Sequence, residues 1–516
     1  MPRLTIALSH AASRTGASKR RRFVAPLAAV ALACAAAAAW AESPAQPTAS
    51  TALDLRSFVQ QIQASNRTIK SKRAERDIAA TSISRAEAAF DPVVSVSTQR
   101  SGTRQQNTLD ERSTRPGDVY ERFGTDYSAA VSQLLSSGAK VEGKVTLSKF
   151  LTSTKQILSA GAESDVRSFY GVTVTQPLLR DSGSSITGAR VRVAKIDTAV
   201  ATAASRDTES SVVAEALFAY WDLTLAQHRL ALAGDKQIMG ERLLEQARNL
   251  NLQGRLSASE VADVQSNLAQ FQAGLIEARM GVQERANRLR TLLMRPPEAS
   301  QLLSVTESLP ARPIEPLAAD AALAVARERR DDLRIRRLAI DREDVQVAYA
   351  RNQAKPRVDL VAAYGLNGLG TSERQALRVG TDAPTWNLGV QLSMPLGANR
   401  QGQADIEAAR LRLEDARLQL QALESAVASD IDTAISMMNS AAQRWSLWDE
   451  ISRREQMQVD QERRRLSAGR SDVREILFRE EKAINARLAV IEQQVAWVKA
   501  QVLLDAAQGI LLERFP

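Results

Sequence analysis

Cysteine, histidine and aromatic residues are scarce in this 516-residue chain. It has one cysteine, Cys34, and two histidines, His10 and His228, while Phe, Trp and Tyr together make up 4% of the residues. These shortages speak against a disulfide framework, a Cys- or His-based metal site and a Ser-His-Asp triad. The sequence therefore predicts a protein that is not an enzyme and that has neither a cofactor nor a metal site.

Glycine and proline are missing from a long segment near the C-terminus. Residues 403–468 contain neither, and after Gly469 the chain continues without them to residue 508. At 1.5 Å per residue, this segment predicts a helix of about 100 Å, far longer than the usual ~11–12 residues. One apolar stripe keeps a heptad register, and Leu411 and Leu418 belong to a second. Two stripes suit a helix with neighbours on two sides. The heptad stripe is Ile406, Ala409, Leu413, Ala416, Leu420, Leu423 and Val427.

The long segment occurs twice. Subtracting 215 places Gly469 on Gly254 and Glu475 on Glu260, and an offset of 264 places Pro356 on Pro92. Between these blocks, residues 390–395 fall on residues 172–177. Because the matching blocks keep the same order, we predict an internal tandem duplication. Five prolines between residues 295 and 318 mark a linker, so the predicted repeats span residues 42–294 and 319–516.

The N-terminus predicts export. Basic residues 19–22 precede an apolar run from Phe23 to Trp40, and Ala39 and Ala41 offer a small-x-small cleavage site. This layout is typical of a secretory signal peptide over residues 1–41, although an uncleaved membrane anchor and lipidation of Cys34 are alternatives.

Long hydrophobic runs are absent after the leader, so no transmembrane helix is predicted there. Removing the leader leaves 62 basic and 59 acidic residues, because it holds six of the 68 Lys and Arg and no Asp or Glu. The remaining charge is small, and we predict no nucleic-acid partner.

Several segments alternate between apolar and polar residues, as strands with two different faces do. Trp386, Leu388 and Val390 alternate with Asn387 and Gly389, and residues 141–148 and 170–174 follow the same pattern. Strands of about ten residues with one apolar face are typical of an outer-membrane β-barrel, although each alone also suits half of a soluble sandwich. A thin aromatic girdle is predicted from the few aromatics in these segments, which are Tyr127, Phe150, Tyr170, Tyr364 and Trp386.

A barrel made from so few strands must be closed by other copies of the chain. Unpaired backbone groups in lipid cost several kcal/mol each, and cyclic symmetry is the simplest way to remove the open edges. We therefore predict an α+β membrane protein in which several copies of the chain share one β-barrel. The resemblance described next implies that the copies form a homotrimer and that a long α-helical barrel continues the β-barrel.

Taken in order, these elements resemble the TolC-like outer-membrane efflux proteins over about residues 53–510. In each half, a helix rich in alanine ends at Pro92 or Pro356, and strands follow that end in Pro-Leu at Pro177 or Pro395. Long helices then turn at a glycine followed six residues later by an acid. The resemblance implies a trimeric channel in the outer membrane with a large periplasmic part. It also implies that the channel joins a periplasmic adaptor and an inner-membrane pump and exports a substrate that the sequence does not identify.

One departure from the family pattern concerns the strands. Pro177 lies 85 positions after Pro92, whereas Pro395 lies 39 after Pro356. Residues 127–134 and 140–149 predict an additional hairpin in this longer interval. The chain can therefore exceed the family's four strands per protomer.

The glycine turns are the predicted functional ends of the helices. Gly254 and Gly469 can take the positive φ values of a tight reversal, and the resemblance places them where an adaptor docks. It also gives Glu475 a place facing the lumen near the periplasmic entrance. A trimer would make a ring of three such carboxylates, as in cation-selective pores.

Further residues beside the turns complete the predicted gate. Glu260 and Asp263, after the first turn, are expected to line the same rim or to hold neighbouring helices together. In the second repeat Phe478 stands where the family often has a second acid, which suggests an apolar constriction. The simpler alternative is that the acids only stabilise the first turn of a helix.

Two other classes of protein remain open at this point. A periplasmic adaptor or scaffold also combines long helical hairpins with strands, but it normally has one hairpin. A secreted enzyme is the second alternative, and no catalytic constellation supports it.

Overall fold

The structure is a computed structural model, and it describes residues 51–115, 117–154, 164–294, 303–311, 313–315, 318–378, 383–468 and 470–515. The predicted signal peptide with Cys34, part of the predicted linker and Gly469 lie outside the described residues.

The first part of the described chain runs from two helices through strands into a helical hairpin. Its elements are β1 (Thr51–Leu53), α1 (Leu55–Ser65), α2 (Arg67–Glu87), η1 (Ala88–Phe90), β2 (Val93–Gln106), α3 (Leu109–Arg112), β3 (Val119–Leu134), β4 (Lys140–Thr152), β5 (Asp165–Pro177), α5 (Ser184–Thr187), α6 (Ala189–Leu252) and α7 (Ala258–Leu292).

The second part presents a similar series with fewer strands. It contains β6 (Leu303–Val305), α8 (Ala319–Arg329), α9 (Asp331–Gln353), β7 (Arg357–Gly370), α10 (Glu373–Leu377), β8 (Pro384–Ser393), α11 (Arg400–Ser467), α12 (Val473–Gln508) and α13 (Leu511–Arg514). In both parts a proline, Pro92 or Pro356, separates the helix from the strand that follows.

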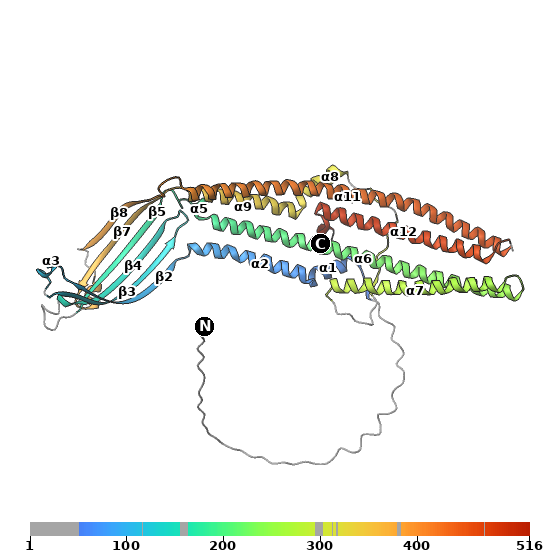
Figure 1. The fold of residues 1–516 in the computed structure, drawn as a ribbon, viewed down its shortest axis with the longest axis horizontal. Coiled ribbons are helices and arrows are strands. Elements are labelled where there is room, and N and C mark those ends of the chain that lie inside the picture. The colour runs from blue at the N-terminus through green and yellow to red at the C-terminus, as the bar shows by residue number, and fades with distance from the viewer. Residues whose placement is uncertain are drawn as a thin grey trace, which may run out of the picture. The chain divides into compact units, whose positions relative to one another are not determined.

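Six strands form one antiparallel sheet in the order β2-β3-β4-β5-β7-β8 (Figure 1). The segments predicted as an additional hairpin are β3 and β4, which pair from Leu134 and Lys140 onward. Pairing of β5 with β7 joins the two parts of the chain, with Val172 opposite Tyr364. Within the described residues, β2 and β8 have a partner on one side only, so each leaves one edge open.

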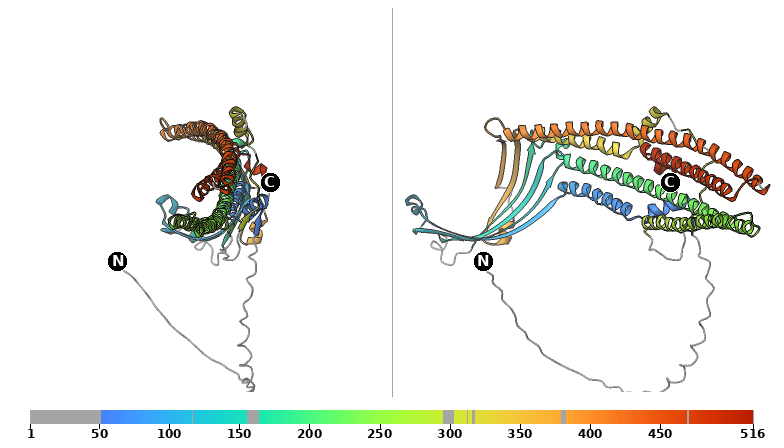
Figure 2. Two further views of the ribbon diagram at one scale, coloured as in Figure 1. Left: turned by 90° about the vertical axis from the view of Figure 1, so that its right-hand side faces the viewer. Right: turned by 45° about the vertical axis from the view of Figure 1, so that its right-hand side comes forward.

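The long helices pack as two hairpins, α6 with α7 and α11 with α12, and α6 also contacts α12. Figure 2 shows them side by side along a curve. The larger core lies where these helices meet α1, and its aromatic contacts join Phe58 to Tyr220 at 5.4 Å and Trp445 to Trp497 at 6.3 Å between ring centroids. A second, mainly aliphatic core, which includes Leu243 and Phe271, ties α6, α7 and α12 together nearer the hairpin ends.

Only one of the two predicted apolar stripes on α11 is covered. Ala409, Ala416 and Val427 are buried, as the heptad register predicts. By contrast, Leu411 and Leu418 are 58% and 57% exposed. One described chain therefore leaves the second stripe without a neighbour.

Within the described residues, no helix combines the length and the apolar composition that a membrane span requires.

The turn at Gly254 depends on its backbone conformation. Gly254 has φ +70 with open space around it, whereas Gly234 lies inside α6 with equally open surroundings and without a positive φ. We expect Gly254→Ala to destabilise the turn by roughly 1–2 kcal/mol. The matched control, Gly234→Ala, should instead stabilise the helix by roughly 0.5–1 kcal/mol. Hydrogen exchange of the amides at residues 249–258, together with denaturant midpoints, measures both changes. Equal effects of the two substitutions would contradict this account.

Candidate functional site

The end of the first hairpin is a capped turn. The amide of Arg255 donates to the carbonyl of Leu250 at 2.9 Å, which closes the turn around Gly254. Ser257 then begins α7 with a capping box: its amide donates to a Glu260 carboxylate oxygen at 2.8 Å, and the Glu260 amide donates to Ser257 Oγ at 3.2 Å. These bonds hold the pKa of Glu260 below its usual value. The Glu260 carboxylate therefore has a local structural partner.

The second hairpin resumes at Asp472, which is the N-cap of α12. Its carboxylate accepts a hydrogen bond from the Glu475 amide at 3.0 Å, so Glu475 sits in the first turn of the helix. The Glu475 side chain pairs with Arg479 at 2.7 Å one turn later. Phe478 is 55% exposed, with the Arg479 guanidinium 5.7 Å from the centroid of its ring. Glu475 and Phe478 are therefore both accessible from solvent in the single chain.

One ion pair joins the two hairpins at their ends. Arg474 Nη2 on α12 donates to Asp263 Oδ2 on α7 at 2.6 Å, and both side chains are about half exposed. The sequence predicted that Asp263 lines the rim or holds helices together, but it gave no indication of Arg474 as the partner. The ion pair places Asp263 next to the start of α12, because its partner Arg474 directly precedes Glu475.

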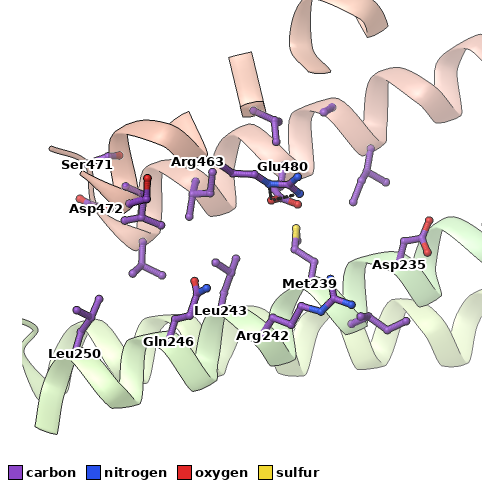
Figure 3. A pocket seen from close by; sticks show the side chains of 18 of the residues that line it. Asp235, Met239, Arg242, Leu243, Gln246, Leu250, Arg463, Ser471, Asp472 and Glu480 are labelled. Atoms are coloured by element: carbon purple, nitrogen blue, oxygen red, sulfur yellow. Dashed lines mark hydrogen bonds and ion pairs between the residues drawn. The ribbon is translucent and has the colours of Figure 1, made fainter. Parts of the chain in front are cut away.

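A cavity of about 1080 Å³ separates the hairpins just behind these ends. As Figure 3 shows, α6 contributes Met239, Arg242 and Leu243 to it, and α11 and α12 contribute Arg463 and Glu480, which form an ion pair of 2.7 Å. The lining thus combines apolar side chains with charged ones. Such a groove between helices suits a helical or polar protein segment better than a compact apolar ligand.

The register of the sheet assigns each strand residue to one of two faces. Directly paired residues share a face, so Val145 with Tyr170, Val172 with Tyr364, and Tyr364 with Trp386 belong together. We call this the apolar face; Trp386 on it is 73% exposed. Its other members include Val94, Val96, Tyr127, Ala129, Val131, Leu147, Val174, Ala362 and Leu388.

The opposite, polar face carries small hydroxyl residues and charges. Ser97 and Ser128 are hydrogen-bonded across β2 and β3 at 2.7 Å. Phe150 lies on this face and is buried, with Arg122 and Arg167 at 4.3 and 5.1 Å from its ring centroid. The sequence placed Phe150 with the girdle aromatics, and this assignment was wrong because Phe150 is an odd number of residues from Val145 and Leu147.

The sequence of residues 322–509 matches the family model described as "Outer membrane efflux protein". A comparison with curated proteins gave no match. The fold is similar to the CmeC outer membrane channel of Campylobacter jejuni, with a TM-score of 0.60 and 14% identity over 89% of this chain and 86% of that one. It is also similar to the outer membrane protein VceC of Vibrio cholerae, with a TM-score of 0.61 and 14% identity over 88% of this chain and 96% of that one.

The MtrE outer membrane channel of Neisseria gonorrhoeae, in its open state, is a further structural relative. Its TM-score is 0.58, with 16% identity over 89% of both chains. At these low identities the structural matches show the fold, a sheet joined to long helices. Together with the family model over residues 322–509, they confirm the predicted resemblance to the outer-membrane efflux proteins.

The Asp263–Arg474 pair offers a test of how the hairpin ends are held. An exposed ion pair contributes only ~0.2–1 kcal/mol, so removing it should loosen the ends without unfolding them. We expect Arg474→Ala to lengthen and broaden the distance between spin labels at Gln253 and Arg470. Cys34 is the sequence's only native cysteine, which simplifies labelling.

The matched control is Arg454→Ala, which removes an exposed arginine that pairs with Glu450 on the same helix. Its label distances should equal those of the parent protein. Identical distances in Arg474→Ala and Arg454→Ala would show that the Asp263–Arg474 pair does not hold the hairpins together.

Proposed function

We propose that this protein is the outer-membrane exit channel of an efflux or type I secretion system. The proposal rests mainly on one observation: the chain combines a surface that suits lipid with a surface that suits water. The six-stranded sheet has an exposed apolar face, while the helices that continue from it are polar on much of their surface. A sheet in the lipid of the outer membrane and helices in the periplasm account for both surfaces.

The open edges support a homotrimer that shares one barrel. The outer edges of β2 and β8 would be unpaired in lipid, where each free backbone group costs several kcal/mol. Pairing β8 of one copy with β2 of the next closes the sheet, and six strands from each chain would give a barrel of 18. The same neighbour would cover Leu411 and Leu418 on α11.

The proposed signal peptide and domain boundaries are those that the sequence predicts. Residues 1–41 form a signal peptide, residues 42–294 and 319–516 are duplicated halves, and residues 295–318 link them. The similar order of helices and strands in the two parts of the described chain supports the duplication.

The groove between the hairpins is the proposed contact for a periplasmic adaptor. It lies beside the turn at Gly254 and combines the buried Leu243 with the exposed Arg242. An adaptor there would connect the channel to an inner-membrane transporter, which supplies the cargo.

The entrance gate is proposed to be formed by Glu475 and Phe478, with Asp263 and Glu260 behind them. Around a threefold axis, Glu475 would form a ring of carboxylates that attracts cations. The contacts of Glu260 favour a capping role, and the pairing of Asp263 with Arg474 favours a role in holding the hairpins together.

A periplasmic scaffold is the alternative function. The apolar face, which has no use in a soluble scaffold, speaks for the channel instead. Carbonate washing separates the two, because an embedded barrel stays with the membranes and a scaffold is released. The channel proposal includes neither catalysis nor a nucleic-acid partner.

Protein extracted from membranes with detergent should have the mass of three processed chains. We expect Leu411→Glu/Leu418→Glu to lower the trimer fraction, since it places six charges against neighbouring helices. The control, Arg410→Glu/Arg417→Glu, changes the exposed residue just before each leucine and should leave the trimer largely intact. A stable monomer as the parent species would overturn the trimer, and equal loss in both variants would overturn the role of the stripe.

Single-channel recording tests the gate. We expect Glu475→Gln to weaken cation preference and block by multivalent cations, because three carboxylates are lost at the narrowest point. Arg479→Gln, which frees Glu475 from its partner, should act in the opposite direction. Glu277→Gln, which removes an exposed acid farther along α7, is the control for net charge. Unchanged selectivity in Glu475→Gln would leave Glu475 as a residue of the helix start only.

A further inference from the structure

We propose that the apolar face of the sheet carries, near its end far from the helices, a binding site for the phosphate groups of membrane lipids, formed by Arg100, Lys149 and Arg374. The inference rests on the proposed function, because it takes the apolar face as the surface in contact with lipid. No step in it depends on the gate or on the adaptor groove.

The register places Arg100 and Lys149 in one row. Arg100 on β2 pairs with Thr125 on β3, which pairs with Lys149 on β4. The preceding row, nearer the helices, contains Thr98, Tyr127 and Leu147 and belongs to the apolar face. Since neighbouring strands lie about 4.8 Å apart, the two basic residues are separated by about 10 Å on the same face. The next row away from the helices holds Gly102, Phe123 and Leu151, and Phe123 is 56% exposed. The two basic residues therefore interrupt the apolar face near its end far from the helices.

The helix α10 lies on this same face beside the basic row. A Cβ atom at Gly368 would come within 2.0 Å of the Ala376 carbonyl oxygen, which shows how closely α10 covers β7. Ser168 on β5 donates a hydrogen bond to that carbonyl. Lys149 Nζ reaches Glu373 at 3.1 Å. The one-turn helix thus adds Arg374 to the border.

Positive charge is in excess along this border. On this face of β2, β3 and β4 beyond the row of Tyr127, and on α10, the described basic side chains are Arg100, Arg104, Lys149 and Arg374, and the described acidic ones are Glu121 and Glu373. Arg104 pairs with Glu121 at 2.9 Å and Lys149 with Glu373. Arg100 and Arg374 are exposed and form no ion pair within the described residues, so their guanidinium groups are available for phosphate.

The surroundings favour a lipid over a soluble anion. Tyr127, Tyr170, Tyr364 and Trp386 lie on the apolar face and shift toward the helices from β3 to β8, as a level girdle on tilted strands would. Leu377 of α10 is also exposed. A ligand that spans this border must have apolar chains on the side of the girdle nearer the helices and an anionic head group beside the basic residues. A phosphorylated lipid has both parts.

Lipid retained by the purified protein tests the site. Trimers extracted in mild detergent would be analysed by native mass spectrometry and by phosphorus content, before and after incubation with phosphatidylglycerol or phosphatidylcholine. We expect Arg100→Gln/Lys149→Gln to retain severalfold less phosphatidylglycerol than the parent. Arg100→Gln alone should show a smaller loss in the same direction, and it leaves every ion pair in place. Phosphatidylcholine binding should change little.

The matched control removes two exposed basic residues from the polar face of neighbouring strands. Arg122→Gln/Arg167→Gln should retain as much phosphatidylglycerol as the parent. Equal retention of phosphatidylglycerol in all variants, or an equal loss in both double variants, would overturn the site. The site would also be overturned if millimolar inorganic phosphate displaced bound phosphatidylglycerol as strongly as added lipid does. Release of the parent protein by carbonate would overturn the proposed channel as well, whereas an embedded trimer without preferential lipid loss would overturn only this inference.

Discussion

The rest of this structure depends on one constraint: a single chain leaves its sheet edges and one face of a long helix without lateral partners. In the described part of the sheet, β2 and β8 each keep one unpaired edge. On α11, the apolar stripe of Leu411 and Leu418 is exposed in the single chain. The two needs differ in physical kind, because the sheet lacks hydrogen-bond partners and the helix lacks apolar contact. The proposed arrangement of identical chains around one axis would meet both needs.

Stability is distributed unevenly along the helices. In the larger core the helices enclose the aromatic side chains of Phe58, Tyr220, Trp445 and Trp497. Truncating such a buried side chain lowers the free energy of unfolding by several kcal/mol. Toward the hairpin ends the core is smaller and mainly aliphatic, with Phe271 as its one aromatic among the described residues. The outermost contacts there are helix caps and the half-exposed Asp263–Arg474 pair. Such contacts are weak, so opening should begin at the ends while the middle of the bundle stays packed. This gradient suits the proposed entrance gate, which would have to move at one end of a rigid conduit.

The candidate site was accessible to sequence reasoning only in part. Repetition of the glycine and the following acid located both turns, and a Ser-x-x-Glu pattern at Ser257 and Glu260 already contained the capping box. Nothing in the sequence connected Asp263 with Arg474, since the two residues are 211 positions apart and a salt bridge leaves no local pattern. The cavity behind the turns was equally hidden, because it is bounded by three different helices.

Local periodicity determined the elements of this protein. A long segment almost free of Gly and Pro predicted α11 and α12, repetition of that segment predicted α6 and α7, and alternation predicted the strands. The order of these elements carried the resemblance to outer-membrane efflux proteins. Apart from the hairpin of β3 and β4, which the sequence predicted, the tertiary structure decided which strands pair, how the helical hairpins meet and which residues of different strands share a face. Phe150 shows the reason: its neighbours in sequence gave it a strand, but a position one residue from Lys149 in an alternating strand puts it on the opposite face, between Arg122 and Arg167. Secondary structure follows from contacts within a few residues, whereas faces and partners depend on registers set across the whole chain.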